Sequence, residues 1–532
     1  MVARGGAAGT AGADGLARRM ASRCLCYFPA ILAALSVAMV LASPLRGLEL
    51  GDEGVVALGG WRILAGQVPY RDFFEVVLPL PLLSLAGAYR LLGVTVAAGR
   101  AVAVLYSAAL AALLLAYSRR LLTRPLFQAA AVAPLVSCGV AAWLLPSHHW
   151  LADVFALGAL LAFDLAADRG RVAWAATGGA LVALCVMTLQ DQGGVLLVGL
   201  ALWCLLAAPR ESRARLTVAA ASGAGAVFVA LAWWLLPRVS AATLLYDWAL
   251  FPVSRYHRFA NNVAGFARTA SETAALWRTG IFWREPVAFG LWNAKVLLVA
   301  AEAVAAWIVL VVGLARRRDV GWRFYLMASG ACAFLLPTFR CLALVNLEWA
   351  LPMAGLAAAW GLERWAGRGD RQRRAAGLIA AAVILVFAGA GLARLPGLLS
   401  EGGPMVITPA GAVGPLPRSE ATDLQGIVDA VAARLRPGEP LFATGFMGML
   451  NVLTGHPSPA PFDVFLPPDY TTPSQVSEAI SALDRSRAEW IAQPAGFGGG
   501  EAWRSYLTRC FEPIYQNARY ELWKRKEGRP IG

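Results

Sequence analysis

Long apolar stretches recur along the chain from residue 28 to residue 394, separated by short polar or charged connections. Each is close to the ~20 residues that an α-helix needs to cross a bilayer, so the pattern predicts a polytopic membrane protein. We expect roughly twelve spans, with a range of about eleven to thirteen. They cover residues 28–45, 77–94, 98–117, 126–144, 151–167, 172–189, 194–208, 215–236, 291–314, 321–338, 343–363 and 375–394.

Two connections in this transmembrane domain, which is expected to cover residues 28–395, are too long to be turns. One covers residues 46–76 and the other residues 237–290, and both mix aromatic, charged and amide residues. Loops of this kind tend to fold over the spans and carry function. We therefore expect the chemistry to involve these two loops.

The pattern changes after Leu395, where charged residues become frequent. The stretch "DLQGIVDAVAARLRPGEPLFATGFMGMLNVLTG" predicts an amphipathic helix, a Pro-Gly turn, a short apolar strand and another helix. "EAISALDRSRAEWIAQPA" predicts a helix followed by a strand, and "NARYELWKRK" predicts a final strand. Residues 396–532 are therefore expected to form a small soluble α/β domain, without a Gly-rich phosphate loop or a nucleophile elbow.

Composition supports the membrane assignment. The chain is 58% hydrophobic and 15% charged, with a mean hydropathy of +0.58, whereas soluble domains carry about a quarter charged residues. Its net charge is +14, but residues 396–532 carry 12 Lys/Arg against 14 Asp/Glu, so the excess lies in the membrane portion. Basic clusters beside spans are typical of cytoplasmic loops, which argues against nucleic-acid binding. The basic segment 1–27 is likewise predicted to be cytoplasmic, which puts the first loop outside.

The first loop is rich in carboxylates. Asp52 and Glu53 directly follow the first span, at the start of a short helix expected over 53–65 and ended by Gly66. A carboxylate at this height can take a proton from an attacking hydroxyl or amine as a bond to an anomeric carbon forms. The alternative is that Asp52 only caps the helix.

The same loop carries a recognisable pattern. "GDEG" follows the first span, and "GQVPYRDFFEVVLPLPLLSLAGAYRLLGVTVAAGR" follows the short helix. This stretch resembles the first extracytoplasmic loop of the GT-C glycosyltransferases. It is similar in particular to the branch of the lipid A aminoarabinose transferases, the protein O-mannosyltransferases and the Rgt-type lipopolysaccharide glycosyltransferases. "ALFPVSRYHRF" and "VLTGHPSPAPFDVFLPPDYTTP" resemble later parts of the same proteins more weakly.

The resemblance implies a GT-C-like fold and a transfer reaction. A sugar carried on a polyprenyl phosphate would move to a lipid, glycan or protein acceptor on the extracytoplasmic face, and Asp52 or its neighbour Glu53 would act as the base. No nucleotide sugar would be needed. Residues of the matched pattern that would contact substrate are Tyr70, Arg71, Asp72, Glu75 and Arg100.

Other polar residues are candidates for substrate contact. His148, His149 and Asp153 begin a span, where the alternative is an interfacial role beside Trp150. The basic group Arg255, His257 and Arg258 could bind a donor phosphate or merely lipid headgroups. Gln190 matches a position of the branch at which relatives carry Lys-Gln.

Two positions depart from the branch. Leu189 stands where relatives often carry the lysine, and Glu348 with Trp349 stands near a position where they often carry a histidine. Both changes remove a cation that could face a phosphate. No Cys/His spacing typical of a metal site is present. No cofactor is therefore predicted, and a requirement for a divalent metal is left open.

The sequence therefore predicts a multi-pass glycosyltransferase of the bacterial inner membrane, with its site on the outer face of the cell envelope. A C-terminal domain on that face requires an odd number of spans if the N-terminus is cytoplasmic, whereas twelve are expected. Either one span is missed or miscounted, which we favour, or the C-terminal domain is cytoplasmic. The alternatives are a transporter or flippase of lipid-linked sugars and a non-catalytic scaffold for envelope assembly. No inverted repeat supports the transporter.

Overall fold

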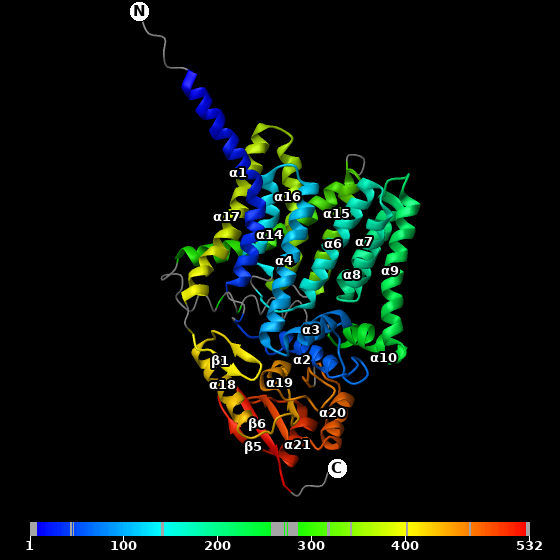
Figure 1. Ribbon diagram of the computed structural model, residues 1–532, viewed down its shortest axis with the longest axis vertical. Coiled ribbons are helices and arrows are strands. Elements are labelled where there is room, and N and C mark those ends of the chain that lie inside the picture. Colours follow the sequence, from blue (N-terminus) through cyan, green and yellow to red (C-terminus); the bar gives the residue numbers. More distant parts are fainter. Residues whose placement is uncertain are drawn as a thin grey trace, which may run out of the picture.

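The structure is a computed structural model that describes residues 8–42, 45, 47–139, 143–256, 271, 274, 286–316, 320–340, 343–400, 403–467 and 470–527. Long helices form a bundle, and residues 403–527 form a smaller α/β domain at one end of it (Figure 1). We call this end of the bundle the domain end and the opposite end, where α1 (Ala8–Leu41) begins, the distal end.

In the part of the chain just defined, eleven helical segments make up the bundle. Six helices are long and apolar enough to cross a membrane, and three more apolar helices are shorter, which identifies a multi-pass integral membrane protein. The segments are α1, α4 (Val96–Leu121), α5 (Pro125–Val132) with η1 (Ala133–Val136), α6 (His148–Arg169), α7 (Val172–Val186), α8 (Gln190–Leu202) with η3 (Trp203–Ala207), α9 (Arg213–Leu235), α14 (Pro286–Ala315), α15 (Trp322–Leu335) with η6 (Leu336–Arg340), α16 (Leu344–Ala366) and α17 (Asp370–Ser400).

The span expected over 77–94 is wrong. Its residues form α3 (Pro79–Leu92), a helix of 14 residues that does not run between the two ends of the bundle (Figure 1). Helix α3 packs beside α2 (Asp52–Leu64) at the domain end of the bundle (Figure 1). Removing this span leaves an odd number, which places α1's start and the C-terminal domain at opposite ends.

Basic residues gather at the distal end. Arg119 and Arg120 lie in the last turn of α4, whose first residue contacts the C-terminal domain through the bond from Val96 N to Ala410 O. Arg371 and Arg373 lie in the first turns of α17, the helix that ends beside that domain. These two basic clusters therefore share one end of the bundle.

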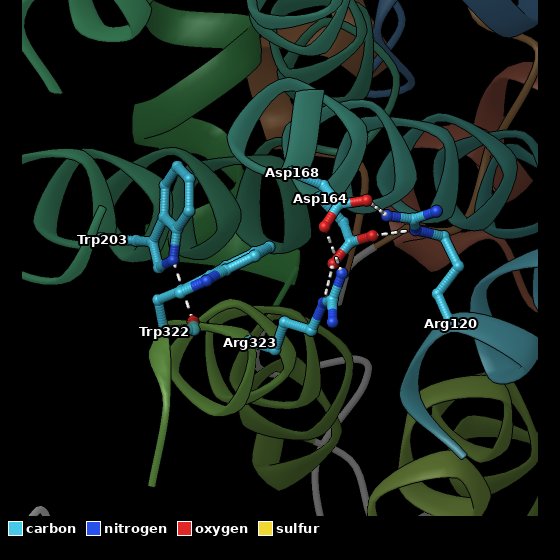
Figure 2. Close-up of polar contacts among 6 residues, drawn as sticks. All are labelled: Arg120, Asp164, Asp168, Trp203, Trp322 and Arg323. Atoms are coloured by element: carbon cyan, nitrogen blue, oxygen red, sulfur yellow. Dashed lines mark hydrogen bonds and ion pairs between the residues drawn. The ribbon is translucent and has the colours of Figure 1, made fainter. Parts of the chain in front are cut away.

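The distal end also holds a buried charge cluster. Asp164 of α6, whose side chain is fully buried, pairs with Arg120 of α4 and, at 2.8 Å, with Arg323 of α15. Asp168, one turn further on, contacts the same two arginines at 2.8 and 2.9 Å (Figure 2). Beside it the indole N–H of Trp203 donates to the Trp322 carbonyl. The cluster joins three spans.

The C-terminal domain contains a two-stranded and a four-stranded sheet. In the larger sheet the order is β3-β4-β6-β5, with β3 parallel to β4 and the other pairs antiparallel. The helices and strands predicted from the sequence are present; β1, β2, β5 and α21 were not predicted. The elements are β1 (Val406–Thr408), β2 (Gly411–Val413), α18 (Arg418–Ala432), β3 (Leu441–Ala443), α19 (Gly448–Thr454), α20 (Pro473–Arg485), β4 (Trp490–Pro494), α21 (Gly500–Cys510), β5 (Phe511–Gln516) and β6 (Tyr520–Arg525).

This domain packs closely on α2. Helix α19 lies so near that a Cβ on Gly54 would stand 2.2 Å from the Met449 nitrogen, so only glycine fits there. Arg62 of α2 donates to Asp463 at 2.6 Å, and both side chains are nearly inaccessible. The backbone N–H of Phe74 donates to the Pro461 carbonyl at 2.8 Å. The first loop and the C-terminal domain are thus one packed unit.

Candidate functional site

A cavity of about 110 Å³ lies where the first loop, the bundle and the C-terminal domain meet. This volume is enough for several water-sized groups. Its polar lining comes from five separate segments. The polar residues are Asp52, Glu75, His148, His149, Thr188, Gln190, Asp191, Arg340 and Tyr470.

Helix α2 presents Asp52 to this cavity. Asp52 is the first residue of the helix, and Gly51 is the N-cap and makes no side-chain cap. The interpretation of Asp52 as the N-cap residue is therefore wrong. The position within the first turn still favours the ionised carboxylate, because the N-terminal end of a helix is electropositive. Val55 and Val56 line the cavity on the same helix.

Glu53 faces away from the cavity lining. Its carboxylate accepts from Arg100 at 2.7 Å, and Arg100 also bonds the carbonyls of Gly47 and Leu144. Burial raises the pKa of Glu53 to about 6, against the attraction of Arg100. This ion pair ties α2 to α4, so Glu53 and Arg100 lie behind the site, where they can position Asp52.

Glu75 lines the cavity and is itself almost inaccessible. Its Oε1 accepts from the backbone N–H groups of Val76 and Val77. Burial nevertheless raises the pKa of Glu75 to about 8, and the nearby Asp463 and Asp247 add to the shift. A protonated Glu75 can donate a hydrogen bond into the cavity at neutral pH.

The remaining candidates in the first loop, Tyr70, Arg71 and Asp72, stabilise the conformation of the loop and do not line the cavity. Tyr70 has a positive φ of 69° and donates its hydroxyl to the Val77 carbonyl, which holds the turn that aims Glu75. Asp72 accepts from the Val68 N–H and pairs with Arg71 at 2.8 Å, and this hydrogen bond lowers the pKa of Asp72. Arg71 and Asp72 are partly exposed and lie outside the lining.

Helices α6 and α8 supply the wall on the side of the bundle. His149 stacks on Trp349 with ring centroids 3.4 Å apart, and His148 lies against His149. Gln190 lines the cavity and donates to the Trp248 carbonyl at 3.4 Å. Asp153 is one turn deeper, outside the lining, and accepts from Gln192 at 2.8 Å.

Arg340 is a cation that our reasoning from the sequence did not assign to the site. It ends η6, lines the cavity and lies 3.3 Å from Asp191. Glu348 does not approach the cavity, since it pairs with Lys295 at 2.8 Å. A charged residue inside an apolar run was the available signal, because such residues usually face a cavity or each other.

The second loop reaches the site only in part. Pro252 lines the cavity, whereas Arg255, in η5 (Pro252–Tyr256), does not. His257 and Arg258 lie outside the described residues. Within the described ranges, no three His, Cys, Asp or Glu side chains gather in a way that could hold a metal ion.

The chain as a whole shares its fold with two solved structures of ArnT from Cupriavidus metallidurans. One is bound to undecaprenyl phosphate and one is in the apo state. For the bound form the TM-score is 0.52 with 14% identity, over 94% of this chain and 98% of that one. For the apo form the values are 0.52, 14%, 95% and 98%.

At this identity the likeness establishes the fold. No protein-family model and no curated protein matches the chain in sequence.

Proposed function

We propose that this protein is a GT-C glycosyltransferase that moves a sugar from a polyprenyl-phosphate donor to a lipid, glycan or protein acceptor. The observation that carries the proposal is the cavity, which has the carboxylate of Asp52 and the guanidinium of Arg340 in one lining at the end of a membrane bundle. The ArnT neighbour bound to undecaprenyl phosphate supports a donor of this lipid class.

Asp52 and Arg340 suit the attacking acceptor and the leaving phosphate of the transfer, respectively. The acceptor oxygen or nitrogen bonds to the anomeric carbon while the bond from that carbon to the donor phosphate breaks, and its electron pair goes to the phosphate. Asp52 takes the acceptor proton. Arg340 stabilises the charge that develops on the phosphate, a role open to it because the sequence carries Leu189 where relatives often have lysine.

The proposed site faces the exterior of a bacterial inner membrane. Cytoplasmic ends of spans carry the excess of Arg and Lys, and here that excess lies at the distal end, with Arg119, Arg120, Arg371 and Arg373. The C-terminal domain lies at the other end (Figure 1), and its residues Phe446 and Tyr470 line the cavity. A donor embedded in the outer leaflet would keep its phosphate at the level of the cavity.

The test compares wild type with Asp52→Asn in membranes supplied with radiolabelled polyprenyl-phosphate sugars. We expect label to enter envelope lipid, glycan or protein with the wild type, and the variant to lose about 100-fold or more of that rate at equal protein level. Asp370→Asn is the matched control, because the Asp370 side chain is 85% exposed at the distal end. Transfer that survives in Asp52→Asn contradicts the role of the base.

The alternatives give different results in the same assay. A flippase would translocate the lipid-linked sugar without forming a new glycosidic bond, and a scaffold would do neither. Binding of donor by wild type and Asp52→Asn alike, with no labelled product from either, therefore supports the flippase. Indifference of envelope assembly to Asp52→Asn supports the scaffold.

A further inference from the structure

A two-stranded hairpin, formed by β1 and β2, lies on the side of the C-terminal domain that faces the bundle (Figure 1). Two backbone hydrogen bonds tie its opposite ends to spans. The carbonyl of Ala410, in its turn, accepts from the N–H of Val96, the first residue of α4, at 3.2 Å. At its base, the N–H of Gly414 donates to the Leu45 carbonyl at 3.1 Å, shortly after α1 ends at Leu41. The whole hairpin therefore lies where these two spans leave the membrane.

The outer face of this hairpin carries two exposed apolar side chains. Side chains of a strand alternate between its two faces. Val406 and Thr408 are buried against the domain, whereas Met405 and Ile407 are 41% and 62% exposed. Among the described residues from 403 onwards, Met405 and Ile407 are the only large hydrophobic residues that are exposed. The domain therefore covers its other large apolar side chains and leaves this pair uncovered at the level of the span ends.

The outer edge of β1 has its backbone groups satisfied by a side chain of the domain. The amide of Gln425, in α18, accepts from the Ile407 N–H at 2.8 Å and donates to the Ile407 carbonyl at 3.2 Å. The same amide nitrogen donates to Asp429 at 2.7 Å. In water, the edge of a strand is solvated at little cost, whereas away from water each unpaired backbone group is costly. Gln425 therefore suits the edge of β1 to an environment that is poor in water.

We propose that the outer face of the β1–β2 hairpin contacts the phospholipid of the bilayer, with Met405 and Ile407 at the boundary between headgroups and acyl chains. Apolar side chains of segments that lie on a membrane bind it in this way. The contact extends the lipid-facing surface of the spans, since Leu41 at the end of α1 and Leu392 near the end of α17 are also exposed. It holds the C-terminal domain, with its wall of the candidate site, at a fixed height on the bilayer. It requires only a bundle that spans a membrane and is independent of the proposed transfer.

The first measurement locates position 407 relative to the bilayer, in the full-length protein in phospholipid nanodiscs. Ile407→Cys is labelled with a fluorophore, and the exposure of the native side chain leaves room for the label. The matched control is Ser505→Cys, labelled in the same way. Ser505 is exposed on α21, a helix that lies away from the bundle (Figure 1). Labelling of the native cysteines is measured on the wild type and subtracted.

Quenching then distinguishes lipid from water and from protein around the label. We expect phospholipids that carry a nitroxide near the top of the acyl chain to quench the label at 407, and to leave the label at 505 bright. A water-soluble quencher should show the opposite preference. Quenching at 407 by the water-soluble quencher alone overturns the inference. Protection of the label at 407 from both quenchers would indicate a protein contact, such as a second copy of this chain, and also overturns it.

The second measurement compares Ile407→Val with Ile407→Thr in the same nanodiscs. Valine and threonine are both β-branched and nearly equal in shape, so both suit the strand, and they differ by a methyl against a hydroxyl group. In contact with lipid the hydroxyl weakens docking of the hairpin. We therefore expect the amides of residues 405–413 to exchange hydrogen about fivefold faster in Ile407→Thr than in Ile407→Val. Equal exchange in the two variants is the result for a side chain in water, and it overturns the inference.

Discussion

At the scale of single residues, Glu75 links burial to chemistry. Its pKa of about 8 means that the side chain is protonated at neutral pH and becomes a buried anion above it. That anion would lie with Asp463 of the C-terminal domain and Asp247 of η4 (Tyr246–Leu250), both of which already raise its pKa. It would repel a donor phosphate in the same cavity.

We therefore predict an alkaline limit on transfer. Because Glu75 loses its proton as pH rises through about 8, the wild type should keep roughly a tenth of its neutral rate one unit above that value. Glu75→Gln, which stays neutral, should abolish this limb in a pH–rate profile. Burial also raises the pKa of Asp247, to about 7, so Asp247→Asn is measured in parallel. If Glu75→Gln keeps the alkaline limb, Glu75 is not the group that titrates.

At the scale of elements, the buried pair between α2 and the C-terminal domain should hold the site together. Arg62 and Asp463 lie 2.6 Å apart with side chains 6% and 0% exposed. Removing one partner leaves the other as an unpaired buried charge, which lowers the free energy of unfolding by about 3–5 kcal/mol. Replacing both partners by apolar residues can restore most of that free energy. Arg62→Met and Asp463→Leu should each lower the Tm and free the C-terminal domain to protease, and the double variant should regain both properties.

This cycle has a clear negative outcome. If the loss of stability in the double variant equals the sum of the losses in the two single variants, the Arg62–Asp463 pair does not couple α2 to the C-terminal domain. Transfer activity provides a second readout, because Val464 and Leu466, beside Asp463, line the cavity. Undocking should remove that wall and lower activity in the single variants.

Helix α2 and strands β3, β4 and β6 were predictable because local signals define them. The acidic pair starts α2, and Gly66, with φ of +88°, follows its end. The span expected at 77–94 failed, because hydropathy does not distinguish a membrane span from a short apolar helix that lies on other helices.

At the scale of the whole molecule, the cavity could be predicted in part. Asp52, Glu75, His148, His149 and Gln190 lie beside span ends or in the first loop, and the structure brings them together. Arg340 and the C-terminal wall, including Phe446 and Tyr470, come from segments far away in sequence. No local pattern encodes such long-range contacts. Glu53 was grouped with Asp52 because adjacent residues share a motif, yet in a helix adjacent side chains face different directions.

The candidate site lies at the domain end of the bundle and the buried charge cluster at the distal end. Substitutions in the charge cluster should therefore alter stability and leave the transfer rate unchanged. Asp164 is fully buried between Arg120 and Arg323, whereas the Asp168 side chain is 43% exposed (Figure 2). Asp164→Asn should cost about 2 kcal/mol, because two hydrogen-bonded ion pairs of a buried carboxylate are lost while the arginines stay partly exposed and keep Asp168. Asp168→Asn should cost less than about 1 kcal/mol, as exposed pairs do.

Thermal unfolding of the purified variants measures the difference in stability between Asp164→Asn and Asp168→Asn. The transfer rate per folded molecule shows whether the distal end affects catalysis. Both variants should turn over at the wild-type rate at low temperature, because the cavity is lined by residues of the C-terminal domain, which lies at the opposite end of the spans (Figure 1). A variant of Asp164 with a normal Tm and slow transfer would contradict this expectation, because it would mean that the distal charges act on the site through the spans that they join.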